Sequence, residues 1–326
     1  MTSLLEVKNL KTHFKKGKQV VKAVDGIDFE IKKGETVALV GESGCGKSMT
    51  SLSIMGLVPS PTGKVKDGQI LLNGVDLVNS PEKKMYKVRG NDIAMIFQEP
   101  MTSLNPVLTI GDQLMSVIIY HLKLSKKQAE IKAIEMLDLV GFSDPKKLLK
   151  DYPHRLSGGM RQRVMIAMAM SCNPQLLIAD EPTTALDVTI QAQVLELMKE
   201  LSMKFSTSIL LITHDLGVVS ELAERVIVMY SGKIVEIASI DDIFDKPLHP
   251  YTEGLINSVP KIDGEIGRLQ AIKGNVPAPG SEIKGCKFAS RCDKVFERCT
   301  QEMPALSKID DTRSVRCFLY DEVGVE

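Results

Sequence analysis

The segment Gly41-Glu42-Ser43-Gly44-Cys45-Gly46-Lys47-Ser48 decides the fold of this chain. It matches G-x-x-x-x-G-K-[ST], the pattern of a phosphate-binding loop (P-loop). An apolar, β-branched run over residues 36–40 precedes the segment and a helical pattern follows it, which is the strand–loop–helix context that the motif requires. Its glycines let backbone N–H groups approach a phosphate closely. The segment therefore predicts a nucleotide site in an α/β fold.

Residues of the loop and of the following helical turn are expected to hold the nucleotide. Lys47 supplies a positive charge at the β- and γ-phosphates, and the Ser48 hydroxyl is a ligand for Mg²⁺. Phe14, in a strand pattern upstream, has two interpretations: a ring that lies on the base, or an ordinary half-buried strand residue. The nucleotide-binding residues expected in this part of the chain are Phe14, Gly41, Ser43, Gly44, Cys45, Gly46, Lys47, Ser48 and Met49.

Composition limits the other possibilities. The 326 residues include 41 Lys plus Arg and 41 Asp plus Glu, so the formal net charge of zero gives no support for binding to nucleic acid or to an anionic membrane surface. No apolar run approaches the roughly 20 residues that span a bilayer, and the first residues lack a signal-peptide pattern. We therefore expect a cytosolic chain whose six cysteines are free thiols or metal ligands rather than disulfides.

The remaining chain alternates between sheet and helix patterns. Residues 4–31 read as antiparallel strands, and Asn73-Gly74 predicts a tight hairpin turn. Residues 107–150 carry apolar positions at helical spacing, with a capping box from Ser125 to Gln128, and suggest a helical insertion between strands. RVIVMYSGKIVEIA predicts a hairpin around Ser231-Gly232.

Polar residues with catalytic potential follow three strand patterns. Gln98 ends one, Asp180-Glu181 ends a second and His214 ends a third, and α/β sheets bind ligands at strand carboxyl ends. Gln98 is either a Mg²⁺ ligand and water-orienting group or an ordinary loop residue. Asp180 is expected to hold Mg²⁺ and Glu181 to accept a proton from attacking water. His214 is either a structural histidine or, at the end of its strand, a residue that contacts a γ-phosphate.

A second anion site is predicted at Ser157-Gly158-Gly159, which precedes a helical pattern. The first N–H groups of a helix lack partners within it and attract negative charge.

Together these motifs resemble the ATP-binding subunit of an ABC transporter. The resemblance covers about residues 4–245. Ser157–Met160 is similar to the LSGGQ signature, except that Met160 replaces the glutamine, and Ala185-Leu186-Asp187 resembles the D-loop. It implies an α/β P-loop NTPase core with an antiparallel β subdomain, a helical insertion and a small C-terminal cysteine-containing extension. The expected domains are residues 1–245, with a helical subdomain at about 99–160, and an extension at 246–326. The resemblance implies that ATP and Mg²⁺ are sandwiched between the P-loop of one subunit and the signature of another.

The tail, with HPYTEGLINSVP and a Pro-rich stretch, resembles the extension of oligopeptide and dipeptide importer ATPases of the D type. Nickel importers share this branch, and a non-transport ABC ATPase is a further alternative. The resemblance implies a second ABC ATPase and two transmembrane permeases as partners, indirectly an external peptide-binding protein, and a peripheral location on the cytoplasmic face of the membrane.

Four cysteines of the tail form the last candidate site: Cys286, Cys292, Cys299 and Cys317. Structural zinc sites usually contain pairs spaced C-x₂₋₄-C, and the spacings here are wider. Iron–sulfur clusters are held by four Cys, and the resemblance also points to a [4Fe–4S] cluster. Zinc and unliganded thiols remain the alternatives.

Overall fold

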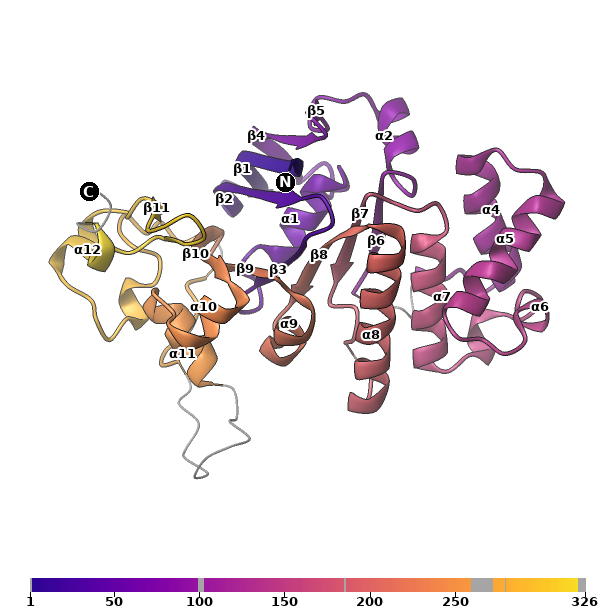
Figure 1. Ribbon diagram of the computed structural model, residues 1–326. Helices are drawn as coiled ribbons and strands as arrows, with labels where there is room; N and C mark the ends of the chain where they lie inside the picture. The colour runs from indigo at the N-terminus through magenta and orange to yellow at the C-terminus, as the bar shows by residue number, and fades with distance from the viewer. Residues whose placement is uncertain (1, 99–102, 185, 259–271, 279, 322–326) are drawn as a thin grey trace. The chain divides into compact units, whose positions relative to one another are not determined.

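The computed structural model describes residues 2–98, 103–184, 186–258, 272–278 and 280–321. The chain forms two compact units, whose elements are labelled in Figure 1. One unit consists of residues 1–3, 31–36 and 79–212, and is called the helical unit here. The other consists of residues 4–30, 37–78 and 213–326, and is called the P-loop unit.

An antiparallel sheet forms the first layer of the P-loop unit. Its strand order is β2 (Gln19–Lys32), β1 (Ser3–Lys16), β4 (Gly63–Leu72) and β5 (Val75–Asp76). Strands β1 and β4 pair from Leu5↔Leu72 to Phe14↔Gly63. Both residues of the β4–β5 turn have positive φ, 47° at Asn73 and 77° at Gly74, as a type I′ hairpin requires. The strands expected in residues 4–31 and the hairpin are therefore confirmed.

A second group of strands in this unit carries the P-loop. Strand β3 (Thr36–Val40) is fully buried and pairs in parallel with β9 (Arg225–Tyr230), as a β-branched and apolar run predicts. Strand β9 pairs antiparallel with β10 (Lys233–Ser239) around Ser231-Gly232, and this confirms the predicted hairpin. Two short strands of the tail, β12 (Ser314–Val315) and β11 (Ser307–Lys308), continue from β10.

Short helices complete the P-loop unit. They are α1 (Lys47–Ile54), α9 (Leu216–Leu222), α10 (Ile240–Asp245), α11 (Pro250–Asn257) and α12 (Glu297–Gln301), with 3₁₀ turns at Ala289–Arg291 and Phe318–Tyr320. One hydrophobic core joins the P-loop strand to the tail: Ala38 and Val40 of β3 share it with Tyr230 of β9 and with Tyr251 and Phe288. The tail is thus packed into the same core as the strand that leads to the P-loop.

Parallel strands and long helices form the helical unit. Strand β7 (Leu176–Asp180) pairs in parallel with β6 (Ile93–Ile96) and with β8 (Ser208–Thr213). The predicted strand before Gln98 ends earlier than expected, at Ile96, so Gln98 lies two residues beyond it. The helices are α2 (Glu82–Val88), α4 (Ile110–Leu122), α5 (Lys126–Leu139), α6 (Pro145–Leu148), α7 (Gly158–Met170) and α8 (Val188–Phe205), with a 3₁₀ turn at Pro153–Arg155.

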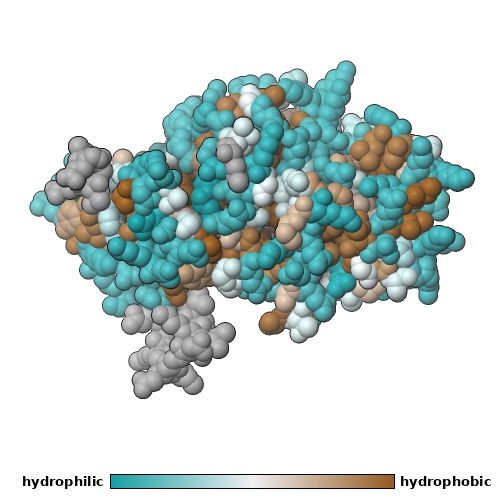
Figure 2. Space-filling model, in the orientation of Figure 1, coloured by the Kyte–Doolittle hydropathy of each residue, from teal (hydrophilic) through white to brown (hydrophobic). Residues whose placement is uncertain are grey.

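The predicted helical insertion corresponds to α4 and α5. The Ser125 side chain accepts from the backbone of Gln128, whose side chain accepts from the Ser125 backbone, so the capping box is present. Helices α4 and α5 pack on each other, and α5 and α8 both contact α7. Apolar side chains are nevertheless exposed on this pair of helices, among them Ile119 and Ile131. Figure 2 shows hydrophobic residues on the surface in this part of the molecule. Within the described residues, no helix has the length and apolarity needed to cross a bilayer.

Candidate functional site

The P-loop is a tight turn between β3 and α1. Gly41 has a φ of 150° and Gly46, which caps α1, has a φ of 113°. A Cβ atom on Gly41 would overlap the Met229 carbonyl oxygen, and one on Gly46 would lie 2.5 Å from the Ala23 oxygen. Only glycine fits at these two positions, because both the φ values and the close backbone contacts exclude a side chain.

Lys47 is held inside the curve of this loop. Its side chain is buried, and its Nζ donates to the carbonyl oxygens of Gly41 at 2.6 Å and of Glu42 at 3.3 Å. Burial raises the pKa of the Cys45 thiol, which therefore stays protonated as a packing group. Ser48 and Met49 are half-buried in the first turn of α1, whereas Ser43 and Gly44 are exposed at the top of the loop.

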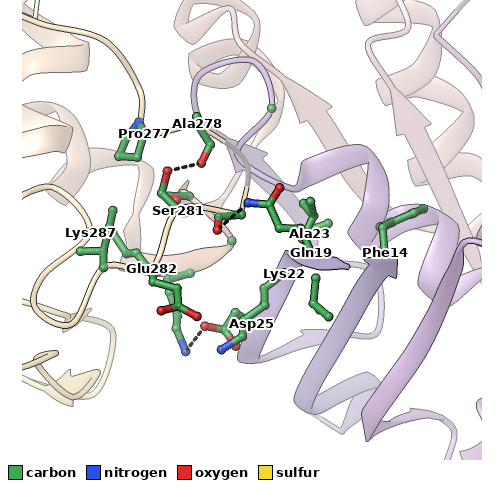
Figure 3. Close-up of a pocket in the computed structure, with 18 of the residues that line it drawn as sticks. Phe14, Gln19, Lys22, Ala23, Asp25, Pro277, Ala278, Ser281, Glu282 and Lys287 are labelled. Atoms are coloured by element: carbon green, nitrogen blue, oxygen red, sulfur yellow. Dashed lines mark hydrogen bonds and ion pairs between the residues drawn. The ribbon is translucent and has the colours of Figure 1, made fainter. Parts of the chain in front are cut away.

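A large cavity adjoins the P-loop. It has a volume of about 1040 Å³ and is lined by the predicted nucleotide residues Phe14, Gly44 and Met49. Figure 3 shows that the C-terminal tail supplies another part of its lining, including Pro277, Ser281, Glu282 and Lys287. The Gln19 side chain links the two parts by donating to the Gly280 carbonyl at 3.2 Å. Sequence reasoning missed these tail residues, since nothing in their local pattern indicates a ligand.

In the helical unit, Gln98 and Glu181 are brought together. Gln98 Nε2 donates to Glu181 Oε2 at 2.8 Å, and Thr184 Oγ1 donates to the same oxygen at 3.0 Å. Glu181 has a φ of 47°, an unusual conformation for a residue with a side chain, and its N–H donates to the Ile212 carbonyl at 2.8 Å. Strained backbone of this kind is concentrated at functional sites. The geometry presents one carboxylate, oriented by two donors, just after a buried strand.

The other two strand-end residues also lie where the sequence predicts. Asp180 is the last residue of β7 and is 4 % exposed. Its carboxylate, the Gln98 amide and the Ser48 hydroxyl are oxygen donors of the type that Mg²⁺ prefers. His214 directly follows β8 and is exposed.

The signature segment forms the N-terminus of α7, as predicted. The Ser157 side chain caps this helix by accepting from the Met160 N–H at 3.3 Å. Ser157, Gly158 and Gly159 line a shallow cavity of about 510 Å³ with Leu186 and Ile190 among the other lining residues. A Cβ on Gly159 would lie 2.7 Å from Cγ2 of Ile190, so the residue must be small. Ala185, part of the predicted D-loop, lies outside the described residues.

The four tail cysteines line one small cavity, with Phe288, Phe296 and Phe318 among its apolar residues. Burial raises the pKa of the Cys286 and Cys292 thiols and raises the pKa of Cys317 to about 11. All six cysteines of the chain carry free thiols in the structure. Among the residues that the structure describes, no group of three or more His, Cys, Asp or Glu side chains is arranged to hold a metal ion. The four thiols thus share one cavity.

Two family models match the sequence. One, described as "ABC transporter", matches residues 24–184. The other, described as "Oligopeptide/dipeptide transporter, C-terminal region", matches residues 235–299. The second match covers most of β10, then α10, α11 and the segment with three of the four tail cysteines.

Curated relatives match over the whole chain. The oligopeptide transport ATP-binding protein AppD of Bacillus subtilis is 64 % identical over 100 % of this chain and 99 % of that protein. The dipeptide transport ATP-binding protein DppD of Bacillus subtilis is 52 % identical over 99 % of this chain and 96 % of that protein.

Solved structures of ATP-binding cassettes share the fold. The dimeric structure of the cassette MJ0796, in a post-hydrolysis state with ADP and Pi, matches 72 % of this chain and 98 % of its own, with a TM-score of 0.65 and 27 % identity. The cbiO1 protein of Clostridium perfringens, part of a cbiONQ transporter complex, matches 76 % of this chain and 92 % of its own, with a TM-score of 0.64 and 25 % identity. Because AppD is similar over the whole chain and both family models match, this chain belongs to the ABC transporter ATPases, in the group that carries the oligopeptide/dipeptide transporter C-terminal region.

Proposed function

We propose that this ATPase powers the uptake of dipeptides and oligopeptides through a membrane transporter. The observation that carries the cargo assignment is the C-terminal region. Residues 235–299 match the region of oligopeptide/dipeptide transporters, and Tyr251 and Phe288 within it share a core with the P-loop strand. The extension is therefore an integral part of the nucleotide-binding unit. The names of AppD and DppD point to the same class of cargo.

The proposed chemistry assigns one role to each strand-end residue. Glu181 accepts the proton of the attacking water, and its hydrogen bonds from Gln98 and Thr184 support this role because they orient the carboxylate. Ser48, Gln98 and Asp180 hold Mg²⁺, which neutralises charge on the phosphates. His214 contacts the γ-phosphate. Lys47 and the N–H groups of the P-loop bind the β- and γ-phosphates.

A complete site requires a second subunit in this proposal. Ser157, Gly158 and Gly159 contact the γ-phosphate of ATP bound to the partner's P-loop, and the exposed start of α7 supplies the N–H groups. The dimeric cassette among the structural neighbours supports such an assembly. The partner is a second ABC ATPase, and the pair docks on two permeases at the cytoplasmic face of the membrane, with an external peptide-binding protein delivering the cargo.

Transport assays with matched variants test the cargo. Cells that lack this chain are complemented with the wild type or with Glu181→Gln, and uptake of labelled dipeptides, pentapeptides and nickel is measured. Peptide uptake that needs the wild-type chain and fails with Glu181→Gln supports the proposal. Nickel uptake that needs the wild-type chain and fails with Glu181→Gln would show that the chain serves a nickel importer. Uptake of every cargo that is the same with and without the chain would favour a non-transport ATPase.

We also propose that the four tail cysteines hold an inorganic group, with a [4Fe–4S] cluster favoured over zinc. The donor set supports this, since four thiols line one cavity enclosed by aromatic side chains. Structural zinc sites usually contain cysteine pairs spaced C-x₂₋₄-C, and the spacings between these four cysteines are wider. A cluster of several metal ions spaces its ligands more widely. Its role would be to fix the tail in place.

A further inference from the structure

Arg291 of the C-terminal extension contacts the P-loop directly. Its two terminal nitrogens donate to the two carboxylate oxygens of Glu42, the second residue of the P-loop, at 2.7 and 3.0 Å. A bidentate pair fixes the orientation as well as the distance of its partners. The Arg291 side chain is only 4 % exposed and that of Glu42 is 29 % exposed, so water and salt screen this pair much less than a surface ion pair.

Arg291 is itself held rigidly. Its Nε donates to the Lys273 carbonyl at 3.0 Å, and one terminal nitrogen also donates to the Tyr230 hydroxyl at 3.3 Å. The guanidinium lies 5.8 Å from the ring centre of Tyr230 and 5.9 Å from that of Phe288. Fixed on three sides, the guanidinium is preorganised to receive Glu42, and little side-chain entropy is lost in forming the pair.

Tyr251 holds the backbone of the same P-loop residue. The N–H of Glu42 donates to the Tyr251 hydroxyl at 2.8 Å. The Tyr251 ring is fully buried, with its centre 4.7 Å from that of Tyr230 and 5.4 Å from that of Phe288. The extension therefore fixes both the main chain and the side chain of Glu42.

Glu42 lies where its position affects phosphate binding. It follows Gly41, at which the strand turns into the loop, and its carbonyl accepts from Lys47. A P-loop binds phosphate with backbone N–H groups, so a change in loop shape changes affinity. A carboxylate at this point would also repel a phosphate if no cation neutralised it.

From these contacts we infer that Arg291 and Tyr251 are positioning residues for the P-loop, through which the C-terminal extension sets the affinity for nucleotide. The inference rests on the proposed nucleotide site. It gives the extension a direct role at the ATP site. It also links the P-loop to the cysteine cavity, because Arg291 immediately precedes Cys292 in the chain and its guanidinium lies near Phe288, which lines that cavity.

Calorimetric titration of the full chain with MgATP and MgADP tests this inference. Arg291→Met should raise the Kd for both nucleotides about tenfold, the size expected for a lost charge-assisted contact, and leave the binding stoichiometry near that of the wild type. Arg291→Lys should give an intermediate Kd because a lysine keeps the charge but loses the fork. Adding Glu42→Gln to Arg291→Met should recover part of the affinity, since the uncompensated carboxylate is removed.

Controls separate this inference from the nucleotide site itself. Arg313→Met removes another extension arginine, which pairs with Asp310 at 2.7 Å and Asp242 at 3.6 Å, and should keep the wild-type Kd. Wild type that fails to bind nucleotide, or Lys47→Ala that binds normally, would refute the nucleotide site. Wild-type Kd values in Arg291→Met would refute only the positioning role. If Arg291→Met fails to fold, Tyr251→Phe decides: a raised Kd supports the inference and an unchanged Kd overturns it.

Discussion

The Gln98 amide donates a 2.8 Å hydrogen bond to the Glu181 carboxylate across 83 residues of sequence. It joins the segment after β6 to the end of the neighbouring strand β7. Gln98 lies two residues beyond the end of β6, and Glu181 directly follows the end of β7. The two side chains therefore meet beyond the carboxyl ends of these strands. The position of the Gln98 side chain is therefore coupled to that of the proposed general base.

Glu181→Gln should bind MgATP but hydrolyse it about 10²–10⁴-fold more slowly than the wild type, because an amide cannot accept the proton of the attacking water. The amide is nearly isosteric with the carboxylate, so folding should be unaffected. Single-turnover phosphate release and nucleotide binding measure the two effects separately. Glu196→Gln, at an exposed position of α8, is the matched control. Turnover close to that of the wild type would show that another group is the base.

Lys47→Ala should weaken ATP binding by at least about tenfold, since a charge-assisted contact contributes about 1.5–3 kcal/mol. The substitution also removes the hydrogen bonds to the Gly41 and Glu42 carbonyls, so the loop itself should become less ordered. Calorimetry measures the affinity, with Lys199→Ala on the exposed face of α8 as control. Unchanged affinity in Lys47→Ala would contradict the P-loop assignment.

The isolated chain should be mostly monomeric and hydrolyse ATP weakly, with a specific activity that rises with protein concentration. The reason is the proposed division of each site between two subunits. Mixing Lys47→Ala with Ser157→Arg at high concentration should restore activity that neither variant has alone, because one of the two sites in a mixed dimer then has both halves intact. Activity per chain that is independent of concentration would argue against a divided site.

The fold around the P-loop was predictable because its signals are local. Strand, glycine loop and helix follow one another within residues 36–54, and the Asn73-Gly74 turn and the Ser125 capping box each depend on residues a few positions apart. The sequence predicts the end of β6 at Gln98, two residues too late, because the apolar pattern of IAMIF continues past Ile96, the last residue of the strand.

The contacts of the tail could not be predicted in this way. Arg291 and Glu42 are 249 residues apart, and neither differs in its local pattern from an exposed charged residue. Their pairing follows from the packing of Tyr251 and Phe288 against β3, a property of the whole core. Long-range contacts of this kind are visible only in the folded structure. The sequence therefore indicated the four tail cysteines, which are recognisable by residue type, but not Arg291 among them.

His249 should make the stability of the P-loop unit depend on pH. Its buried ring caps α11, with Nδ1 accepting from the Tyr251 N–H at 3.0 Å, and burial lowers its pKa from 6.5 to about 3. Between these values the unfolded chain binds a proton that the folded chain does not, so this contribution is complete above pH 6.5 and is lost as the pH falls toward 3. Thermal melts from pH 7.5 to 5 should show a falling Tm.

His249→Asn provides the comparison, because asparagine also caps helices but does not titrate. Its melting temperature should change less over the same range. The difference between the two curves isolates His249, since the buried Glu236, whose pKa burial raises, is present in both proteins. Parallel curves would mean that His249 is not the group that titrates.

Anaerobic purification should yield a coloured protein with a broad visible absorbance band and about four irons and four sulfides per chain, as a [4Fe–4S] cluster requires. Cys292→Ser removes one of the thiols that line the cavity and should abolish the colour. Cys172→Ser, which alters a buried thiol in the helical unit, should leave it unchanged and so controls for general damage.

Removal of the group should have a local effect. The cysteine cavity is small, and its Phe288 belongs to the core that contains the P-loop strand, so loss of the bound group should loosen the tail before the rest of the chain. Hydrogen exchange should therefore increase first in residues 286–317 of the chelated protein. A colourless protein with one zinc per chain would show that the four cysteines bind zinc instead of a cluster. Thiols that bind no metal, with exchange unchanged by chelators, would leave the four cysteines as packing residues only.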